Sequence, residues 1–159
     1  MTDRRAATVN TGEKETLVLF LDYLRECIVA KTEGLDDEAL RRSTVPSGTS
    51  LLGLVKHLTM AETFWFQHVF AGTEVIVPES DLEPDDTTES VIAGYQAACA
   101  AGNEVVAACD DLDQLGVRQG TRPVALSLRW DLVHMIEETA RHAGHADIIR
   151  EQIDGQVGR

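Results

Sequence analysis

The sequence predicts an all-α protein folded as a four-helix bundle. Four segments of roughly 18 to 26 residues repeat their apolar residues with the helical period. Strand signals are almost absent, because only residues 74–77 are rich in β-branched side chains and this stretch is too short to form a sheet alone. A four-helix bundle is the smallest arrangement that buries four apolar stripes together. With 159 residues, the chain fits one domain with a single core.

The first helix follows a polar N-terminus. Residues 1–12 are expected to form a mobile tail of the single domain (1–159), and helical periodicity starts near Glu13. This helix should end before Gly34, and its apolar stripe has spacings of four, three and four residues: Leu17, Leu21, Leu24 and Ile28. Asp36 then has the position of an N-cap for a short helical turn.

Three further segments complete the chain. The second helix is predicted over residues 50–71, and the acidic, proline-containing residues 72–88 are expected to form a long loop or crossover. The third helix has a narrow seam of small residues that lets a neighbouring helix come close: Val91, Tyr95, Ala98, Gly102, Val105 and Cys109. After a second irregular stretch, residues 110–124, the fourth helix is predicted over residues 128–153, and Gly155 ends it.

Composition argues against several kinds of partner. The chain has 14 Lys and Arg against 27 Asp and Glu, and this net charge of −13 repels nucleic acids and anionic membrane surfaces. The longest apolar run, residues 17–21, is too short to span a bilayer, and the N-terminus lacks the apolar stretch of a secretion signal. Three cysteines without a C-x-x-C motif indicate a reduced, cytoplasmic protein in which Cys27, Cys99 and Cys109 are small buried side chains on helix faces.

Histidines on two helices are the most informative residues. His57 lies on the apolar stripe of the second helix and is expected to point inward. His68 follows eleven residues later, about 16 Å along the axis, which is too far to share one small site with His57. On the fourth helix, Glu138 and His142 are four residues apart, so their side chains project side by side.

Two more histidines belong to the same polar stripe of the fourth helix. His134 and His145 fall within about 40° of Glu138 on the helical wheel. The stripe borders an apolar face that is expected to include Leu132, Ile136 and Ala140. Spacing alone does not choose between His142 and His145 as the partner of Glu138.

His57, Glu138 and one histidine of the fourth helix would form a set of two imidazoles and one carboxylate. Such a set holds a divalent metal and leaves coordination positions open for water or substrate. Its nitrogen and oxygen donors favour zinc, with nickel and iron as alternatives. The structural alternative is a hydrogen-bonded core histidine and a polar pair on a helix, with His134 and His145 as surface groups or as groups that support the ligands.

Four other residues have both a functional and a structural interpretation. Arg129 and Arg141 either bind an acidic substrate group or are solvated helix side chains. Trp65 and Trp130 either line the mouth of a pocket or pack in the core. Nucleophilic catalysis finds no support, because the chain has no Gly-x-Ser-x-Gly turn and no cysteine with a histidine nearby in sequence.

Two long motifs resemble the signature helices of the DinB-like superfamily. They are SLLGLVKHLTMAETFWFQHVFAG (residues 50–72) and SLRWDLVHMIEETARHAGHADIIRE (residues 127–151). The likeness covers the chain from about Glu13. It is strongest to the actinobacterial branch that includes the mini-circle proteins and the mycothiol-dependent enzymes.

The resemblance implies a bundle in up-down-down-up order, usually a homodimer, with a divalent metal bound by the second and fourth helices. Carried over onto this chain, the metal ligands are His57, Glu138 and His142. Many relatives have three histidines, whereas the branch typified by mycothiol-dependent maleylpyruvate isomerase has a glutamate in place of one, and this sequence agrees with the glutamate form. The resemblance also implies a low-molecular-weight thiol, such as mycothiol, as cosubstrate.

The leading hypothesis is therefore a metal-dependent thiol S-transferase that joins the thiol to a small-molecule electrophile in detoxification or stress metabolism. A metal cation favours thiolate over thiol and so activates the sulfur at neutral pH. The alternatives are a non-catalytic metal-binding or dimerisation protein, and a metal-dependent hydrolase in which His145 or His134 carries protons. No catalytic residue is assigned beyond the metal ligands, with His145 as a candidate supporting group.

Overall fold

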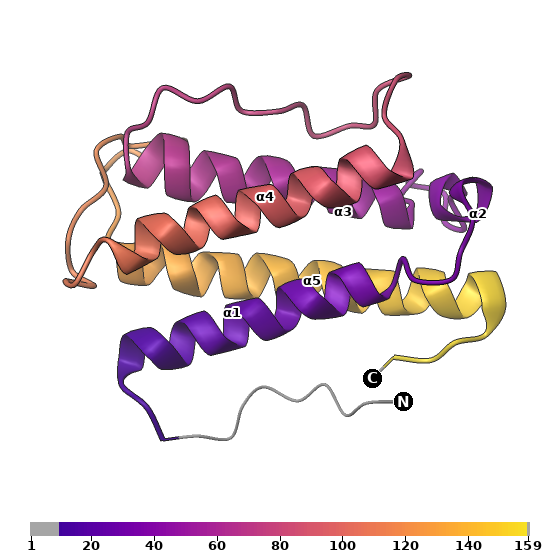
Figure 1. Cartoon of the computed structure of the whole chain (residues 1–159), viewed down its shortest axis with the longest axis horizontal. Helices are drawn as coiled ribbons and strands as arrows, with labels where there is room; N and C mark the ends of the chain where they lie inside the picture. The colour runs from indigo at the N-terminus through magenta and orange to yellow at the C-terminus, as the bar shows by residue number, and fades with distance from the viewer. Residues whose placement is uncertain (1–9, 159) are drawn as a thin grey trace.

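The structure is a computed structural model that describes residues 10–158, and it is built from helices (Figure 1). They are α1 (Glu13–Ala30), α2 (Asp37–Arg41), α3 (Leu51–Glu62), the π-helix η1 (Thr63–Phe70), α4 (Thr88–Ala107) and α5 (Leu128–Asp154). The described range contains no strand, only an isolated bridge between Leu115 and Ser127, so the all-α prediction is confirmed. The predicted tail falls mainly on residues 1–9, which lie outside the described residues. None of these helices combines the length and the apolar composition needed to cross a membrane.

The long helices run in two directions (Figure 1). α1 and α5 run one way, whereas α3 with η1, and α4, run the other way. α1 packs mainly against α5, α3 packs against α4, and α3 also contacts α5. Because α3 and α4 are parallel, residues 71–87 form a crossover that returns along the length of the molecule, on the outside of the helices. The pair α3 and α5 carries all three predicted metal ligands.

Capping side chains set the helix starts. The side-chain oxygens of Asp36, Ser50, Thr87 and Ser127 each accept a hydrogen bond from a backbone N–H in the first turn of α2, α3, α4 and α5. Gly155 ends α5 with a φ of 79°, a left-handed conformation that glycine adopts without a side-chain clash. These local signals explain why the predicted helix bounds agree closely with the structure.

The seam of small residues on α4 brings the helices into close contact. A Cβ atom at Gly102 would lie 2.9 Å from Cδ2 of Phe66 and 3.2 Å from Oε2 of Glu62, so only glycine fits at this crossing. Four other predicted seam residues, Val91, Tyr95, Ala98 and Cys109, are also buried. The prediction is wrong at Val105, which is half-buried, and the neighbouring Val106 is buried in its place.

The second long helix departs from the prediction after Glu62. The chain continues as a helix, but Thr63–Phe70 widens into a π-helix. Its buried side chains include two adjacent pairs, Trp65 with Phe66 and Val69 with Phe70. A π-helix is rare, and its wider turn depends on the packing around it rather than on a local sequence signal.

The predicted apolar line of α5 is wrong in part. Ala140 is exposed and Ile136 is only half-buried. Positions four apart drift by about 40° per step around an α-helix, so a line drawn by fours leaves the core within two turns. The buried line alternates spacings of three and four residues: Leu128, Leu132, Met135 and Thr139.

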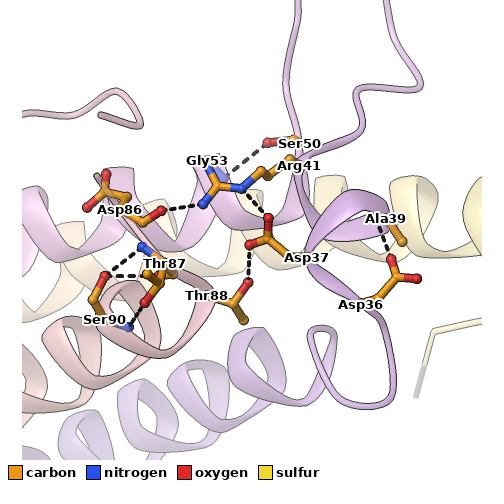
Figure 2. A network of polar contacts seen from close by, with 10 residues as sticks. All are labelled: Asp36, Asp37, Ala39, Arg41, Ser50, Gly53, Asp86, Thr87, Thr88 and Ser90. Atoms are coloured by element: carbon orange, nitrogen blue, oxygen red, sulfur yellow. Dashed lines mark hydrogen bonds and ion pairs between the residues drawn. The ribbon is translucent and has the colours of Figure 1, made fainter. Parts of the chain in front are cut away.

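A polar network fastens α2 to the end of the crossover and the start of α4 (Figure 2). The hydroxyl of Thr88 donates to Asp37, at 2.7 Å, and Arg41 bonds both Asp37 and the backbone oxygen of Asp86. The ammonium of Lys56, on α3, also lies 2.9 Å from the Asp86 carboxylate. The end of the crossover is therefore held against α2, α3 and α4.

Candidate metal centre

Three side chains from α3 and α5 meet at one point. Nε2 of His57 lies 3.0 Å from Oε1 of Glu138, and Nε2 of His142 lies 3.1 Å from the same oxygen. The two imidazole rings are 4.8 Å apart between centroids and inclined at 68°. We call these three residues the His/Glu/His cluster. Spacing left His142 and His145 open as partners of Glu138, and the structure brings His142 to the carboxylate.

The cluster lies at the edge of the core. The side chains of His57, Glu138 and His142 are 29%, 18% and 16% exposed. Each of the three side chains is therefore mostly buried but keeps some contact with solvent. His57 points inward from α3, as its place on the apolar stripe predicts.

Contacts behind the His/Glu/His cluster orient the imidazole of His57 and leave Nδ1 of His142 without a partner in the described part of the chain. Nδ1 of His57 lies 2.9 Å from the hydroxyl of Ser80, which belongs to the crossover. Nδ1 of His142 is buried and has no hydrogen-bond partner among the described residues. The ring of His145 is 5.5 Å from that of His142, and His145 itself is exposed.

The electrostatics of the cluster favour an ionised Glu138 carboxylate and a neutral His142 imidazole. Burial raises the pKa of Glu138, but the hydrogen bond from His57 and the charge of His142 outweigh burial and bring the pKa below its ordinary value. Burial also lowers the pKa of His142, and the nearby charge of Glu138 only partly offsets this. Metal ligands must be deprotonated, so this is the protonation state that binds a cation.

The donor set fits a divalent metal ion. Each residue offers one ligand atom, and the three atoms lie within 4.8 Å of one another. Ligand atoms around one zinc ion are about 3 to 4 Å apart, because each lies about 2.0 to 2.2 Å from the metal. Two nitrogens and one oxygen leave at least one coordination position for a further ligand.

His68 and His134 make their contacts outside the cluster. His68 stacks on Phe64, with 5.8 Å between ring centroids, and Nδ1 of His68 lies 3.0 Å from the guanidinium of Arg118. His134 contacts the rings of Trp65 and Trp130 at 4.9 Å and 4.8 Å. His68 therefore takes no part in the cluster, and His134 is its aromatic neighbour one helical turn before Glu138.

The arginines and tryptophans that had both a functional and a structural interpretation contact other residues of the protein. Arg129 forms ion pairs with Glu13 and Asp113, and Arg141 pairs with Glu137 on its own helix. Trp65 is buried in the core, and Trp130 packs against it while half-buried. Core packing is therefore the correct interpretation of Trp65.

The cysteines are all free, as expected. Cys109 is buried but lies just beyond the end of α4, whereas Cys27 and Cys99 are only half-buried, so the prediction of buried side chains on helix faces holds in part. Burial raises the pKa of the Cys99 thiol to about 12, which keeps it protonated at neutral pH.

Sequence reasoning missed three polar features. Ser80 behind His57 belongs to an irregular segment that has no recognisable pattern. The buried ion pair of Arg25 with Glu62 joins residues 37 positions apart. Asp131 is 1% exposed, and neither of its carboxylate oxygens has a hydrogen-bond partner among the described residues. The only sequence signal for Arg25, Glu62 and Asp131 is that each is a charged residue at a helix position where the apolar repeat would place a buried side chain.

The fold and the cluster together define an all-helical protein with a two-histidine, one-carboxylate cluster between two long helices. The family model for mycothiol S-transferases matches residues 16–155. The chain therefore belongs to the mycothiol S-transferase family, a DinB-like family, and the resemblance found in the sequence is confirmed. No curated protein matches the chain.

Proposed function

We propose that this protein is a metal-dependent thiol S-transferase. In this proposal His57, Glu138 and His142 hold a divalent cation, with zinc favoured over nickel or iron by two nitrogen donors and one oxygen donor. A low-molecular-weight thiol of the mycothiol type is the cosubstrate, and a small electrophile receives the sulfur. The observation that carries the proposal is the convergence of two imidazoles on one carboxylate oxygen in a chain of this family.

The residues of the chain have separate tasks in the proposed reaction. A bound divalent cation would favour the thiolate form of the cosubstrate and fix its sulfur beside the electrophile. Glu138 supplies the negative charge that holds the cation, and the imidazoles of His57 and His142 supply neutral donors. Ser80 orients the ring of His57 through Nδ1, so that Nε2 faces the cluster.

Further parts of the proposal concern architecture and supporting groups. The directions of the long helices support an up-down-down-up four-helix bundle that forms one domain. We also propose a homodimer, on the family resemblance alone, and a cytoplasmic location, which the three free cysteines support. His145 is proposed to support His142, because its ring is the neighbour of that ligand.

Metal content tests the ligand assignment directly. Protein purified without chelator should contain close to one equivalent of a divalent metal by elemental analysis, and His142→Ala should lose it. His68→Ala is the matched control, because it removes a histidine that contacts Phe64 and Arg118 instead of the cluster. Equal metal content in the two variants would refute the assignment of His142 as a ligand.

A panel of thiols tests the reaction and its rivals. Turnover of a generic electrophile with one thiol, only in the metal-loaded protein, supports thiol transfer. Hydrolysis of an ester in the absence of thiol supports a metal-dependent hydrolase instead. Metal-dependent thermal stability with no turnover under either condition supports a non-catalytic metal-binding protein and contradicts the enzymatic proposal.

A further inference from the structure

An aromatic cluster lies beside the His/Glu/His cluster on α5. His134 stacks on Trp130 with 28° between the rings, and it meets Trp65 edge-on at 81°. Trp130 and His134 are half-buried, so each ring exposes part of its surface. His134 lies one helical turn before Glu138, which places the exposed aromatic surface next to the cluster.

An arginine from the loop before α5 lies on this aromatic surface. The guanidinium of Arg122 is 5.4 Å from the centre of the Trp130 ring, a distance at which a cation is attracted to the ring face. Among the arginines in the described part of the chain, only Arg42 and Arg122 form no ion pair with a carboxylate. An arginine without such a partner is unexpected in a chain with a net charge of −13.

Arg122 and the His/Glu/His cluster lie on either side of His134. Burial does most to lower the pKa of His134, and the charges of Glu138 and Arg122 then act on it in opposite directions. Both charges are therefore near the same ring. A small molecule in contact with Arg122 and His134 would therefore lie beside the cluster, because His134 is one helical turn before Glu138.

We propose that Arg122, Trp130 and His134 form a subsite for an aromatic carboxylic acid, with the guanidinium bound to the carboxylate and the two rings against the aromatic frame. This deepens the proposed function, because it rests on that function and assigns the electrophile to the class of aryl acids. Arg122 is suited to this role because its planar guanidinium binds a carboxylate through two parallel hydrogen bonds. The stacking on Trp130 holds the guanidinium in place before the ligand arrives.

Binding of two probes tests the subsite without turnover. The probes are trans-cinnamate and its uncharged analogue trans-cinnamamide, titrated into metal-free protein while tryptophan fluorescence is recorded and confirmed by calorimetry. The chain has two tryptophans, and both belong to this aromatic cluster, so the fluorescence reports on the subsite. We expect cinnamate to bind about fivefold more tightly than cinnamamide, which corresponds to about 1 kcal/mol, and the preference should fall with added salt.

Variants distinguish a specific contact with Arg122 from a general effect of positive charge on binding. Arg122→Gln should remove the preference for cinnamate, and Arg122→Lys should retain part of it, because the charge remains but the planar fork is lost. Arg42→Gln is the control, since it removes the same charge from the end of α2, at the opposite end of the molecule (Figure 1). It should leave the preference unchanged.

Two results would overturn the inference. One is equal binding of the two probes to the wild-type protein, and the other is a preference that survives Arg122→Gln. Because these measurements use metal-free protein, a failure of metal loading or of thiol transfer leaves them intact. Conversely, thiol transfer to uncharged electrophiles that does not depend on Arg122 would contradict this subsite and leave the proposed function standing.

Discussion

Asp131 should make the stability of this protein fall as the pH rises. Its side chain is 1% exposed in the first turn of α5, and neither carboxylate oxygen has a hydrogen-bond partner among the described residues. Burial raises the pKa of Asp131 from 3.8 to about 7. Because the folded-state pKa lies above the unfolded-state value, the carboxyl group contributes most to stability below about pH 4 and loses that contribution as the pH rises through about 7.

The magnitude follows from the pKa of Asp131. One pH unit of difference between the folded and unfolded pKa corresponds to about 1.4 kcal/mol, so ionised Asp131 reduces the free energy of unfolding by up to about 4 kcal/mol. Asp131→Asn cannot ionise and keeps nearly the same shape. We expect the stability of this variant relative to wild type to increase by about 3 kcal/mol between pH 5 and pH 8.

Urea unfolding of both proteins across this pH range measures the effect. Histidines and other carboxylates titrate in both proteins, so the difference between the two stability curves isolates Asp131. Asp110→Asn is the control for loss of one negative charge, because Asp110 is exposed. A difference between Asp131→Asn and wild type that stays constant with pH would show that the reasoning about Asp131 is wrong.

Further substitutions test the packing of α4 and the orientation of His57. Gly102→Ala should reduce the free energy of unfolding by about 1 to 3 kcal/mol, because the new Cβ would lie 2.9 Å from Phe66; Gly94→Ala, whose Cβ would meet its nearest neighbour at 3.9 Å, should stabilise α4 by about 0.5 to 1 kcal/mol. If urea unfolding shows that both variants change the free energy of unfolding in the same direction, the close approach of Phe66 to Gly102 does not explain the effect. Ser80→Ala should weaken zinc binding by about 10- to 100-fold, since it removes the hydrogen bond to Nδ1 of His57. Calorimetric titration with zinc measures this, and unchanged affinity in a variant with an unaltered Tm would exclude the orienting role.

The fold could be predicted from the sequence because its signals are local. Apolar residues at helical spacing, the capping residues Asp36, Ser50 and Ser127, and the terminal Gly155 act within one or two turns of chain. The π-helix Thr63–Phe70 could not be predicted in this way. Its wide turn depends on the surrounding core, and the residues within it have the pattern of an ordinary buried helix.

The parts of the candidate site that follow from helix periodicity could be predicted from the sequence. A four-residue spacing places Glu138 and His142 together, and the apolar stripe turns His57 inward, so all three members of the cluster were identifiable. Spacing alone did not choose between His142 and His145, because both positions lie on one face of α5; the family resemblance pointed to His142, and the structure brings this residue to the carboxylate. The contact of Ser80 with His57 could not be predicted, because the path of the crossover is fixed by contacts distant in sequence.

The position of α3 also depends on the buried ion pair between Arg25 and Glu62, which is separate from the His/Glu/His cluster. Arg25 of α1 donates two hydrogen bonds to Glu62, at 2.7 and 2.6 Å, and a third to Asn103 of α4, at 2.7 Å. This one guanidinium therefore joins α1, α3 and α4. Because Glu62 lies only five residues after His57, the ion pair fixes the rotation of α3 and its position along its own axis close to the cluster. A buried ion pair of this kind adds little net stability over well-packed apolar residues, because desolvation offsets its attraction. Its contribution here is positional, since a shift of α3 by one residue, about 1.5 Å, would move Nε2 of His57 out of hydrogen-bond distance of Glu138.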